Sequence, residues 1–221
     1  MPSLTVENYV KSIFTICSSQ RGEPAATGQL ATALGVSPGT VTSMLKTLSE
    51  SNLATYTPYE GVRLTLAGNA LALRVLRRHR LIELFLVKTL SLSWDEVHEE
   101  AEHMEHAVSD WLIDRIDSTL GYPQTDPHGD PIPRRDGSMD IPESPSLADC
   151  HVGERFVLTR VMDQSPEFLR YLSGTGLPLG TSGQVIANGR EAGIVTIRVA
   201  ENETTLGREA AEKLRVTKLA D

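Results

Sequence analysis

The sequence predicts an α+β protein with an N-terminal winged helix-turn-helix, a helical middle region and a small β domain at the C-terminal end. Three observations support this prediction. Residues 1–67 have the pattern of a helix, a short helix, a turn, a helix and a hairpin. Residues 68–120 repeat apolar side chains at helical spacing. Residues 150–221 consist of short Val, Ile and Leu runs separated by Gly and Asn, which is typical of strands.

The composition is that of a globular protein. Of the 221 residues, 40% are hydrophobic and 23% are charged, which is too apolar for wholesale disorder. The sequence has no run of about 18 apolar residues that could span a membrane, and no charged leader followed by an apolar block. Its two cysteines cannot form a disulfide framework. We therefore expect a cytoplasmic protein that does not bind a membrane.

The net charge of −8 hides an uneven distribution. Residues 1–80 carry eight Lys and Arg against four Glu, a net charge of +4. Residues 81–221 carry 13 Lys and Arg against 25 Asp and Glu, a net charge of −12. A basic N-terminal region suits a polyanionic partner, so the acidic total does not exclude nucleic acid.

The winged helix-turn-helix is predicted from local features of residues 1–67. Apolar spacing indicates a first helix over 4–20. A second, short helix ends at Gly35, which suits a C-terminal cap. Ser37 is a natural N-cap and Pro38 takes the first position of the third helix. A Tyr-Glu-Gly turn between two alternating runs then predicts a β-hairpin, the wing.

The remaining domains follow in order along the chain. Residues 68–120 are predicted to form one helix over 68–90 and another over 93–120. Residues 121–149 contain six of the twelve prolines and no apolar period, which favours a partly ordered linker. Residues 150–221 are expected to form a small antiparallel barrel or sandwich.

Histidine and glutamate side chains cluster on the two predicted long helices. Four of the six histidines fall between residues 79 and 106. Four side chains share an arc of about 100° on the second helix, and an i,i+4 pair lies on the first. The four on the second helix are His98, Glu102, Glu105 and His106, and the pair on the first helix is His79 and Glu83. A cation would relieve the repulsion among the carboxylates; the alternative is a solvated charged face with surface histidines.

The ligand types narrow the choice of metal ion. Carboxylate oxygen and imidazole nitrogen, without thiolate, suit Mn²⁺ or Fe²⁺ and also accept Zn²⁺ or Co²⁺. Zinc would bind tightly by the general order of divalent-metal affinities, so selectivity must come from coordination number and cellular supply. The cysteines show no structural zinc spacing.

In these motifs the chain resembles the diphtheria toxin repressor family of metal-dependent transcriptional regulators, which includes iron- and manganese-sensing repressors. The resemblance covers essentially the whole chain. It rests on LTVENYVKSIF, GVSPGTVTSMLKTL, RHRLIELFL, EVHEEAEHMEHAVSD, PHGDPIP and EFLRYLSGTGLPLG. The HxxxExxEH spacing with RHRLxE upstream is its most specific part. The resemblance implies a homodimer formed by the helices of residues 68–120, operator DNA as partner, and an SH3-like domain over 150–221.

The resemblance also implies two metal sites. The primary site would use Asn8, Glu102, Glu105 and His106. The ancillary site would use His79, Glu83 and His98, with two ligands from the C-terminal domain, where Gln164 and Glu167 hold the matching positions. The usual acid and amide are exchanged at these last two positions, but both still offer oxygen.

Three positions decide which metal is expected. Asn8 is neither the Met of the iron sensors nor the Asp of the manganese sensors, but its carbonyl oxygen is a neutral hard ligand. Glu102 replaces the Cys of the iron sensors and matches the manganese sensors. Lys11 stands where the manganese type has an acidic ligand, and its ammonium opposes a coupled binuclear site. We therefore expect two mononuclear sites with Mn²⁺ as cofactor, Fe²⁺ as the alternative, and Zn²⁺ or Co²⁺ able to substitute in vitro.

DNA recognition is expected at the start of the third helix, whose N-terminal residues would face base edges in the major groove. The candidates there are Ser37, Pro38, Gly39, Thr40, Thr42 and Ser43. Because these residues are small, specificity would depend on methyl contacts, DNA shape and water. Lys46, and Arg63 in the wing, would contact phosphates. The simpler alternative is that Ser37 is only a cap and Thr40 only a surface residue.

The expected function is repression of metal-uptake genes with Mn²⁺ as co-repressor, with an iron-responsive repressor of the same family as the alternative. Metal would tie the first helix to the dimer core and so favour the DNA-binding arrangement. Two other classes stay open. Glu and His on facing helices could support a carboxylate-bridged metal hydrolase, and a winged-helix regulator could take an organic ligand while its charged cluster is structural.

Overall fold

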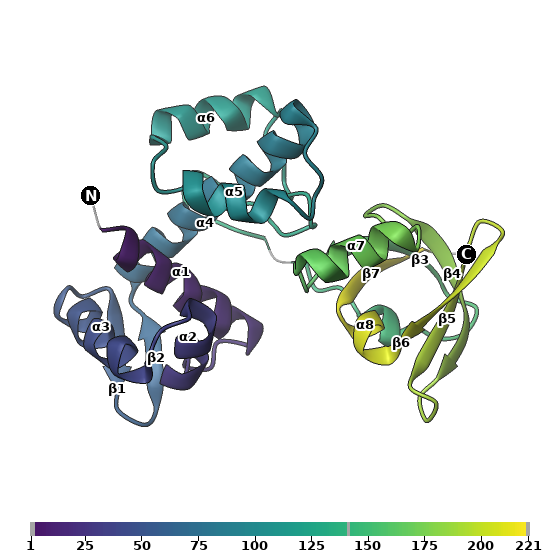
Figure 1. The fold of residues 1–221 in the computed structure, drawn as a ribbon, viewed down its shortest axis with the longest axis horizontal. Coiled ribbons are helices and arrows are strands. Elements are labelled where there is room, and N and C mark those ends of the chain that lie inside the picture. Colours follow the sequence, from purple (N-terminus) through teal and green to yellow (C-terminus); the bar gives the residue numbers. More distant parts are fainter. Residues whose placement is uncertain (1–2, 141, 220–221) are drawn as a thin grey trace. The chain divides into compact units, whose positions relative to one another are not determined.

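A computed structural model describes residues 3–140 and 142–219 (Figure 1). Contacts divide them into two units. The first unit comprises residues 3–79, 102–110 and 133–139, and the second comprises residues 80–101, 111–132, 140 and 142–219. Each unit contains its own cluster of buried apolar side chains. Within the described part of the chain, no helix combines the length and apolar character that crossing a membrane requires.

The first unit contains the winged helix-turn-helix (Figure 1). Its helices are α1 (Leu4–Ser19), α2 (Thr27–Leu34) and α3 (Pro38–Glu50). Strand β1 (Ala54–Thr57) pairs antiparallel with β2 (Gly61–Leu64). This order confirms the helix, short helix, turn, helix and hairpin that the sequence predicts.

The turn between α2 and α3 forms for the local reasons that the sequence indicated. Gly35 adopts a φ of +64°, in the left-handed region that favours glycine. The backbone N–H of Thr40 donates to Ser37 Oγ at 3.1 Å and closes the N-cap. Pro38 begins α3, where a missing N–H costs nothing. The orientation of α3 is therefore determined by a few neighbouring residues.

Helix α4 spans Leu66–Leu90, close to the predicted range. The single helix predicted over 93–120 is wrong, because the chain forms α5 (Val97–Met104) and α6 (Asp110–Thr119) with a break between them. Arg78 Nη2 of α4 donates to Asp110 Oδ1 at 2.8 Å where α6 begins. The break is stabilised by such contacts between residues far apart in the chain, which periodicity does not reveal.

The second unit contains the C-terminal β domain, which confirms the predicted small antiparallel domain (Figure 1). Its strands are β3 (Arg155–Val161), β4 (Ser182–Gly189), β5 (Ile194–Val199), β6 (Asn202–Gly207) and β7 (Leu214–Leu219). They form one sheet in the order β6-β5-β4-β3-β7, so the last strand lies beside the first.

Three short helical elements accompany this sheet. They are the 3₁₀ helix η1 (Leu147–Asp149) and the helices α7 (Pro166–Gly174) and α8 (Arg208–Glu212). Helix α7 was not predicted from the sequence, although its pattern is amphipathic. Leu169 and Leu172 of α7 are fully buried in the core of the domain, which explains why this short segment is helical.

The proline-rich segment is held against the first strand of this sheet. The backbone N–H of Val161 donates to the carbonyl of His128 at 2.9 Å. Gly129 has a φ of +85°, and a Cβ there would lie 2.1 Å from the carbonyl oxygen of Thr159. Only glycine allows this close approach. The approach fixes the backbone on either side of Gly129, which positions His128.

Candidate metal centre

Charged and polar side chains from α1, α4 and residues 102–110 converge in the first unit. We call this group the α1 cluster. It consists of Glu7, Asn8, Lys11, His79, Glu102, Glu105 and His106. All members come from the unit that holds the winged helix-turn-helix. The cluster thus joins α1 of the DNA-binding module to the end of α5 and the residues that follow it.

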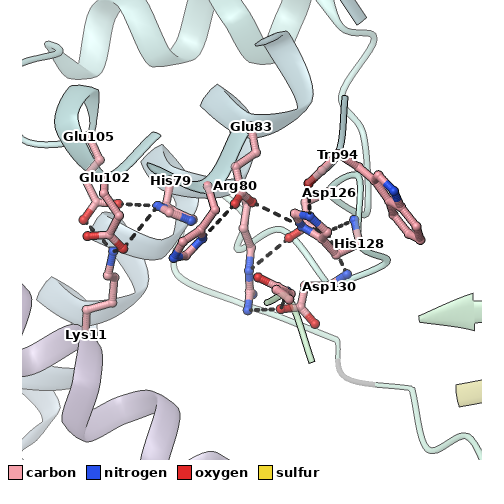
Figure 2. Close-up of polar contacts among 12 residues, drawn as sticks. Lys11, His79, Arg80, Glu83, Trp94, Glu102, Glu105, Asp126, His128 and Asp130 are labelled. Carbon is pink, nitrogen blue, oxygen red and sulfur yellow. Dashed lines mark hydrogen bonds and ion pairs between the residues drawn. The ribbon is translucent and has the colours of Figure 1, made fainter. Parts of the chain in front are cut away.

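Three members of the α1 cluster form a group able to hold a metal ion (Figure 2). His79 Nδ1 lies 2.6 Å from Glu105 Oε2 and 3.9 Å from Glu102 Oε1. One ligand atom from each of the three lies within 4.8 Å of the others. Lys11 Nζ donates to Glu102 Oε1 at 2.5 Å and to Glu105 Oε1 at 2.6 Å.

Glu105 is the most deeply placed carboxylate of the α1 cluster, with no exposed side-chain surface. Burial raises its pKa, but the hydrogen bond with His79 and the charge of Lys11 outweigh that effect and hold the pKa below its ordinary value. Glu105 is therefore ionised at neutral pH. This is the state in which a carboxylate binds a divalent cation.

Two further atoms of the cluster are buried and have no hydrogen-bond partner among the described residues: Asn8 Oδ1 and His106 Nε2. Both belong to predicted primary ligands. His106 Nδ1 lies 2.6 Å from Glu7 Oε2, and donation there leaves Nε2 with a free lone pair. His106 Nε2 also lies 3.2 Å from Glu105 Oε1. Neutral amide oxygen, carboxylate oxygen and imidazole nitrogen fit a hard or borderline divalent ion.

Glu7 has a role that the sequence analysis missed. Its side chain is 9% exposed, and Arg78 Nη1 lies 3.7 Å from its Oε1. Glu7 therefore orients the His106 ring while Arg78 compensates its charge. The only hint in the sequence was its position directly before Asn8.

A second buried group lies in the second unit (Figure 2). We call it the linker cluster: Glu83, Asp126 and His128, with His98 and Asp130 beside them. One ligand atom each of Glu83, Asp126 and His128 lies within 4.8 Å of the others, and all three residues are buried. His98 Nδ1 lies 3.2 Å from Glu83 Oε1, and His128 Nδ1 lies 3.8 Å from Glu83 Oε2.

His128 is held in one orientation by Trp94. Its Nε2 lies 2.8 Å from the Trp94 carbonyl oxygen, and the two rings stack with centroids 6.1 Å apart (Figure 2). Trp94 Nε1 in turn donates to Ser173 Oγ of α7 at 2.9 Å. With Nε2–H donated to a carbonyl, Nδ1 is left as the acceptor nitrogen.

Acidic neighbours dominate the linker cluster. Burial raises the pKa of Asp126 well above its ordinary value, and the charges of Asp130 and Glu83 raise it further, against the weaker lowering effect of Arg80. Arg80 Nε lies 3.7 Å from Asp126 Oδ2. Asp126 and His128 were not predicted as site residues, because a proline-rich segment gives no helical spacing to place them.

One ligand atom each of His79, Glu83 and His98, the predicted ancillary ligands on the helices, lies within 4.8 Å of the others. His79 pairs with Glu105, whereas Glu83 pairs with His98. Gln164 Nε2 donates to Asp130 Oδ2 at 3.1 Å, at the edge of the linker cluster. Glu167 is 81% exposed on α7, and its Oε1 lies 3.5 Å from Arg170 Nη2.

The predicted DNA-contacting residues lie mostly on the surface of α3. Those exposed are Ser37, Pro38, Gly39, Thr40, Ser43 and Lys46. Thr42 is half-buried, and its Oγ1 donates to the Pro38 carbonyl at 2.9 Å. Arg63 donates to the Gly22 carbonyl and lies 3.4 Å from Glu23 Oε2. Arg63 is therefore bonded within its own module.

A surface hollow lies between α3 and the wing. It is lined by Ala26, Thr27, Thr42, Lys46, Tyr56, Pro58, Tyr59 and Gly61. Tyr59 is fully exposed in the turn of the wing, with a φ of +67°. Of this set, only Thr42 and Lys46 were predicted from the sequence, because the others come from the start of α2 and from the hairpin and gather beside α3 only in the folded module.

Three family models match successive parts of the chain. Residues 1–62 match the iron dependent repressor N-terminal DNA binding domain, and residues 65–134 match the iron dependent repressor metal binding and dimerisation domain. Residues 146–218 match the FeoA domain. The diphtheria toxin repressor of Corynebacterium efficiens is 30% identical over 228 residues, which cover 97% of this chain and 96% of that protein. The iron-dependent repressor IdeR of Mycobacterium leprae is 28% identical over 232 residues, 97% of each chain.

Solved structures of similar fold include manganese-dependent regulators. A manganese-dependent transcriptional repressor in complex with manganese is 39% identical, with a TM-score of 0.88, over 97% of this chain and 100% of that chain. The manganese regulator SloR is 32% identical, with a TM-score of 0.78, over 97% and 98% of the two chains. ScaR with bound Zn²⁺ is 30% identical, with a TM-score of 0.82, over 99% and 100%.

Proposed function

Since the chain belongs to the iron-dependent repressor family, which includes the diphtheria toxin repressor, we propose that it represses transcription with Mn²⁺ as co-repressor. Manganese is favoured over iron because Glu102 supplies oxygen where the iron sensors have Cys, and carboxylate and amide oxygens suit Mn²⁺. The 39% identity to a manganese-dependent repressor supports the same choice. A DNA-binding repressor acts where the chromosome lies, in the cytoplasm.

One observation carries the proposal: α1 and residues 102–110 bring predicted metal ligands together, with Asn8 Oδ1 and His106 Nε2 buried and without a hydrogen-bond partner among the described residues. A divalent cation bound by ligands from both segments would hold the two segments together. Asn8 would ligate from α1, and Glu102, Glu105 and His106 from the other side. Because α1 belongs to the DNA-binding module, ligand groups on α1 couple the site to the position of α3.

The linker cluster is the proposed second metal site. We assign to it Glu83 and His98, two of the three ancillary ligands on the helices that the resemblance implies, and add Asp126 and His128. The buried Asp126 carboxylate, whose pKa is raised, gains from a divalent cation, and His128 Nδ1 is oriented to bind one. Roles for Gln164 and Glu167 stay predictions.

The DNA-binding face is proposed to be the exposed start of α3 together with the hollow beside the wing. Lys46 is exposed on α3 and lines the hollow with Tyr56 and Tyr59. A cation beside aromatic and hydroxyl groups suits a phosphate backbone. A homodimer is proposed through the helical region, where Trp111 of α6 is 71% exposed.

The test is metal-dependent binding to DNA by the full-length protein. Genomic fragments retained in the presence of Mn²⁺ would be selected, and their affinity measured by fluorescence anisotropy with Mn²⁺, Fe²⁺, Zn²⁺ or chelator. We expect binding with Mn²⁺, loss with chelator, and a steep fall with salt. Equal affinity with and without metal would remove the co-repressor role.

A pair of lysine variants locates the DNA face in the same assay. Lys46→Ala should weaken binding to all fragments and reduce the salt slope by about 1 for each protomer bound to DNA. Lys88→Ala removes the same charge from an exposed position near the end of α4 and should change neither. Equal effects of the two variants would mean that α3 does not contact phosphates.

The relatives named above are repressors or regulators, so an enzymatic role such as metal hydrolysis is not proposed. An organic co-repressor is disfavoured by the donor set itself. Carboxylates around Lys11 and unpartnered neutral donors suit a small cation better than an organic molecule.

A further inference from the structure

Lys11 occupies an unusual place for a lysine. Its side chain is only 12% exposed, and its ammonium donates to the carboxylates of both Glu102 and Glu105 (Figure 2). Lysine side chains are rarely buried unless they are paired. Both partners of Lys11 are proposed metal ligands, and both lie on the segment opposite α1.

The Lys11 ammonium contacts two carboxylates at once, as a bridging metal cation would. One positive group, covalently attached to α1, touches two carboxylates more than 90 residues later in the chain. The repulsion between Glu102 and Glu105 that favours a metal ion is therefore already relieved by a side chain. Glu7 adds a second link from α1, through His106.

We propose that Lys11 is a tethered counter-cation of the metal site, which holds α1 against residues 102–110 in the metal-free protein and raises the metal concentration at which the site fills. The inference rests on the proposed metal-dependent function. An incoming divalent ion must displace the ammonium from Glu102 and Glu105 or share these carboxylates with it. Either event costs free energy that a neutral side chain at position 11 would not impose.

The two effects have opposite signs, which separates this role from an ordinary structural ion pair. Loss of the Lys11 charge should loosen α1 in the metal-free protein, because Glu105 is left buried with less compensation. The same loss should tighten metal binding, because a competing cation is gone. A residue that merely stabilised the fold would weaken metal binding when removed, since a loosened α1 presents its ligands less well.

The experiment compares Lys11→Met with the wild-type full-length protein after chelator treatment. Isothermal titration with Mn²⁺ alone measures affinity, and hydrogen exchange measures protection of α1 with and without Mn²⁺. We expect Lys11→Met to bind Mn²⁺ on the order of tenfold more tightly, and to lose α1 protection that Mn²⁺ then restores. Unchanged or weaker Mn²⁺ binding, or unchanged α1 exchange, overturns the proposal.

Two more variants make the result interpretable. Lys88→Met removes one charge from the exposed end of α4 and should reproduce the wild type in both measurements. Lys11→Arg keeps a cation and should retain α1 protection without tighter Mn²⁺ binding, so it tests the proposal even if Lys11→Met fails to fold. If the wild type binds no Mn²⁺, the proposed function fails, while the exchange of metal-free α1 still reports whether Lys11 holds this helix.

Discussion

In the α1 cluster, Glu105 lies 2.6 Å from both an ammonium and an imidazole, and its pKa is lowered. In the linker cluster, Asp126 is equally buried, but its strongest charged neighbours are Asp130 and Glu83, and its pKa is raised. Both groups could hold a metal ion. The α1 cluster contains the positive charge that its carboxylates need. The linker cluster contains too little positive charge, so its carboxylates depend more on a bound proton or an external cation.

Because of this difference, removing a carboxylate should change the stability of the metal-free protein differently in the two clusters, whereas its effect on metal binding should have the same sign in both. Removing a carboxylate from a compensated group exposes its partners' charges and costs stability. Removing one from a group of like charges relieves repulsion. Metal binding should weaken in both cases, because each carboxylate is a proposed ligand. The stability of the metal-free protein is therefore the quantity that distinguishes the two regions.

The largest effect is expected from Glu105→Gln. Loss of a carboxylate ligand should weaken Mn²⁺ binding at the α1 cluster by about 100-fold or more, since even an outer partner of a ligand is worth about 10–100-fold. The metal-free protein should lose about 3 kcal/mol, because Lys11 and His79 keep their places without their buried counter-charge. Titration calorimetry and urea unfolding measure the two. Glu100→Gln, at an exposed position on α5, is the control.

Asp126→Asn should shift stability in the opposite direction. The new amide oxygen can still accept the backbone N–H groups of His128 and Asp130, which donate to Asp126 Oδ1 at 2.8 and 2.9 Å. The repulsion from Asp130 and Glu83 disappears. We expect the unfolding temperature of the metal-free protein to rise by about 2–4 °C, as for a gain near 1 kcal/mol. A fall comparable with that of Glu105→Gln would show that the clusters do not differ.

The pH dependence should sharpen the contrast. Glu105 has a lowered pKa, so its stabilisation is present above the ordinary glutamate pKa of about 4.3 and is lost as pH falls through the folded-state value. Asp126 has a raised pKa, so its contribution is present below about 3.9 and is lost as pH rises through the folded-state value. Measured on the metal-free protein across pH, the loss in the free energy of unfolding caused by Glu105→Gln should become smaller in acid. The Asp126→Asn gain should grow towards neutral pH, and parallel profiles would contradict both assignments.

The smallest effect is expected from an exposed ion pair. Lys213 Nζ donates to Asp163 Oδ2 at 2.8 Å, with side chains 45% and 29% exposed. Exposed pairs contribute about 0–1 kcal/mol. Asp163→Asn should therefore change the free energy of unfolding by less than about 0.5 kcal/mol, as measured by urea unfolding. An effect as large as that of Glu105→Gln would mean that burial is not what separates the regions.

Features that depend on residues close together in the chain could be predicted from the sequence alone. Gly35, Ser37 and Pro38 predicted the turn before α3, and the structure has this turn with its cap. Apolar spacing predicted α1 and α4 to within a few residues. The histidine and glutamate spacing also pointed to the region where Glu102, Glu105 and His79 meet. These features are local because caps, turns and helical faces involve residues a few positions apart.

Which charged side chains meet could not be predicted in this way, because it depends on how distant segments pack. Lys11 pairs with carboxylates 91 and 94 positions away, and His106 with Glu7 at 99. His79, which was predicted to act with Glu83, also pairs with Glu105, a residue just beyond the end of α5 at Met104. Asp126 and His128 come from a segment without periodicity. Pairing between distant charges depends on how helices and loops pack, and the spacing of residues along one element carries no information about a partner on another.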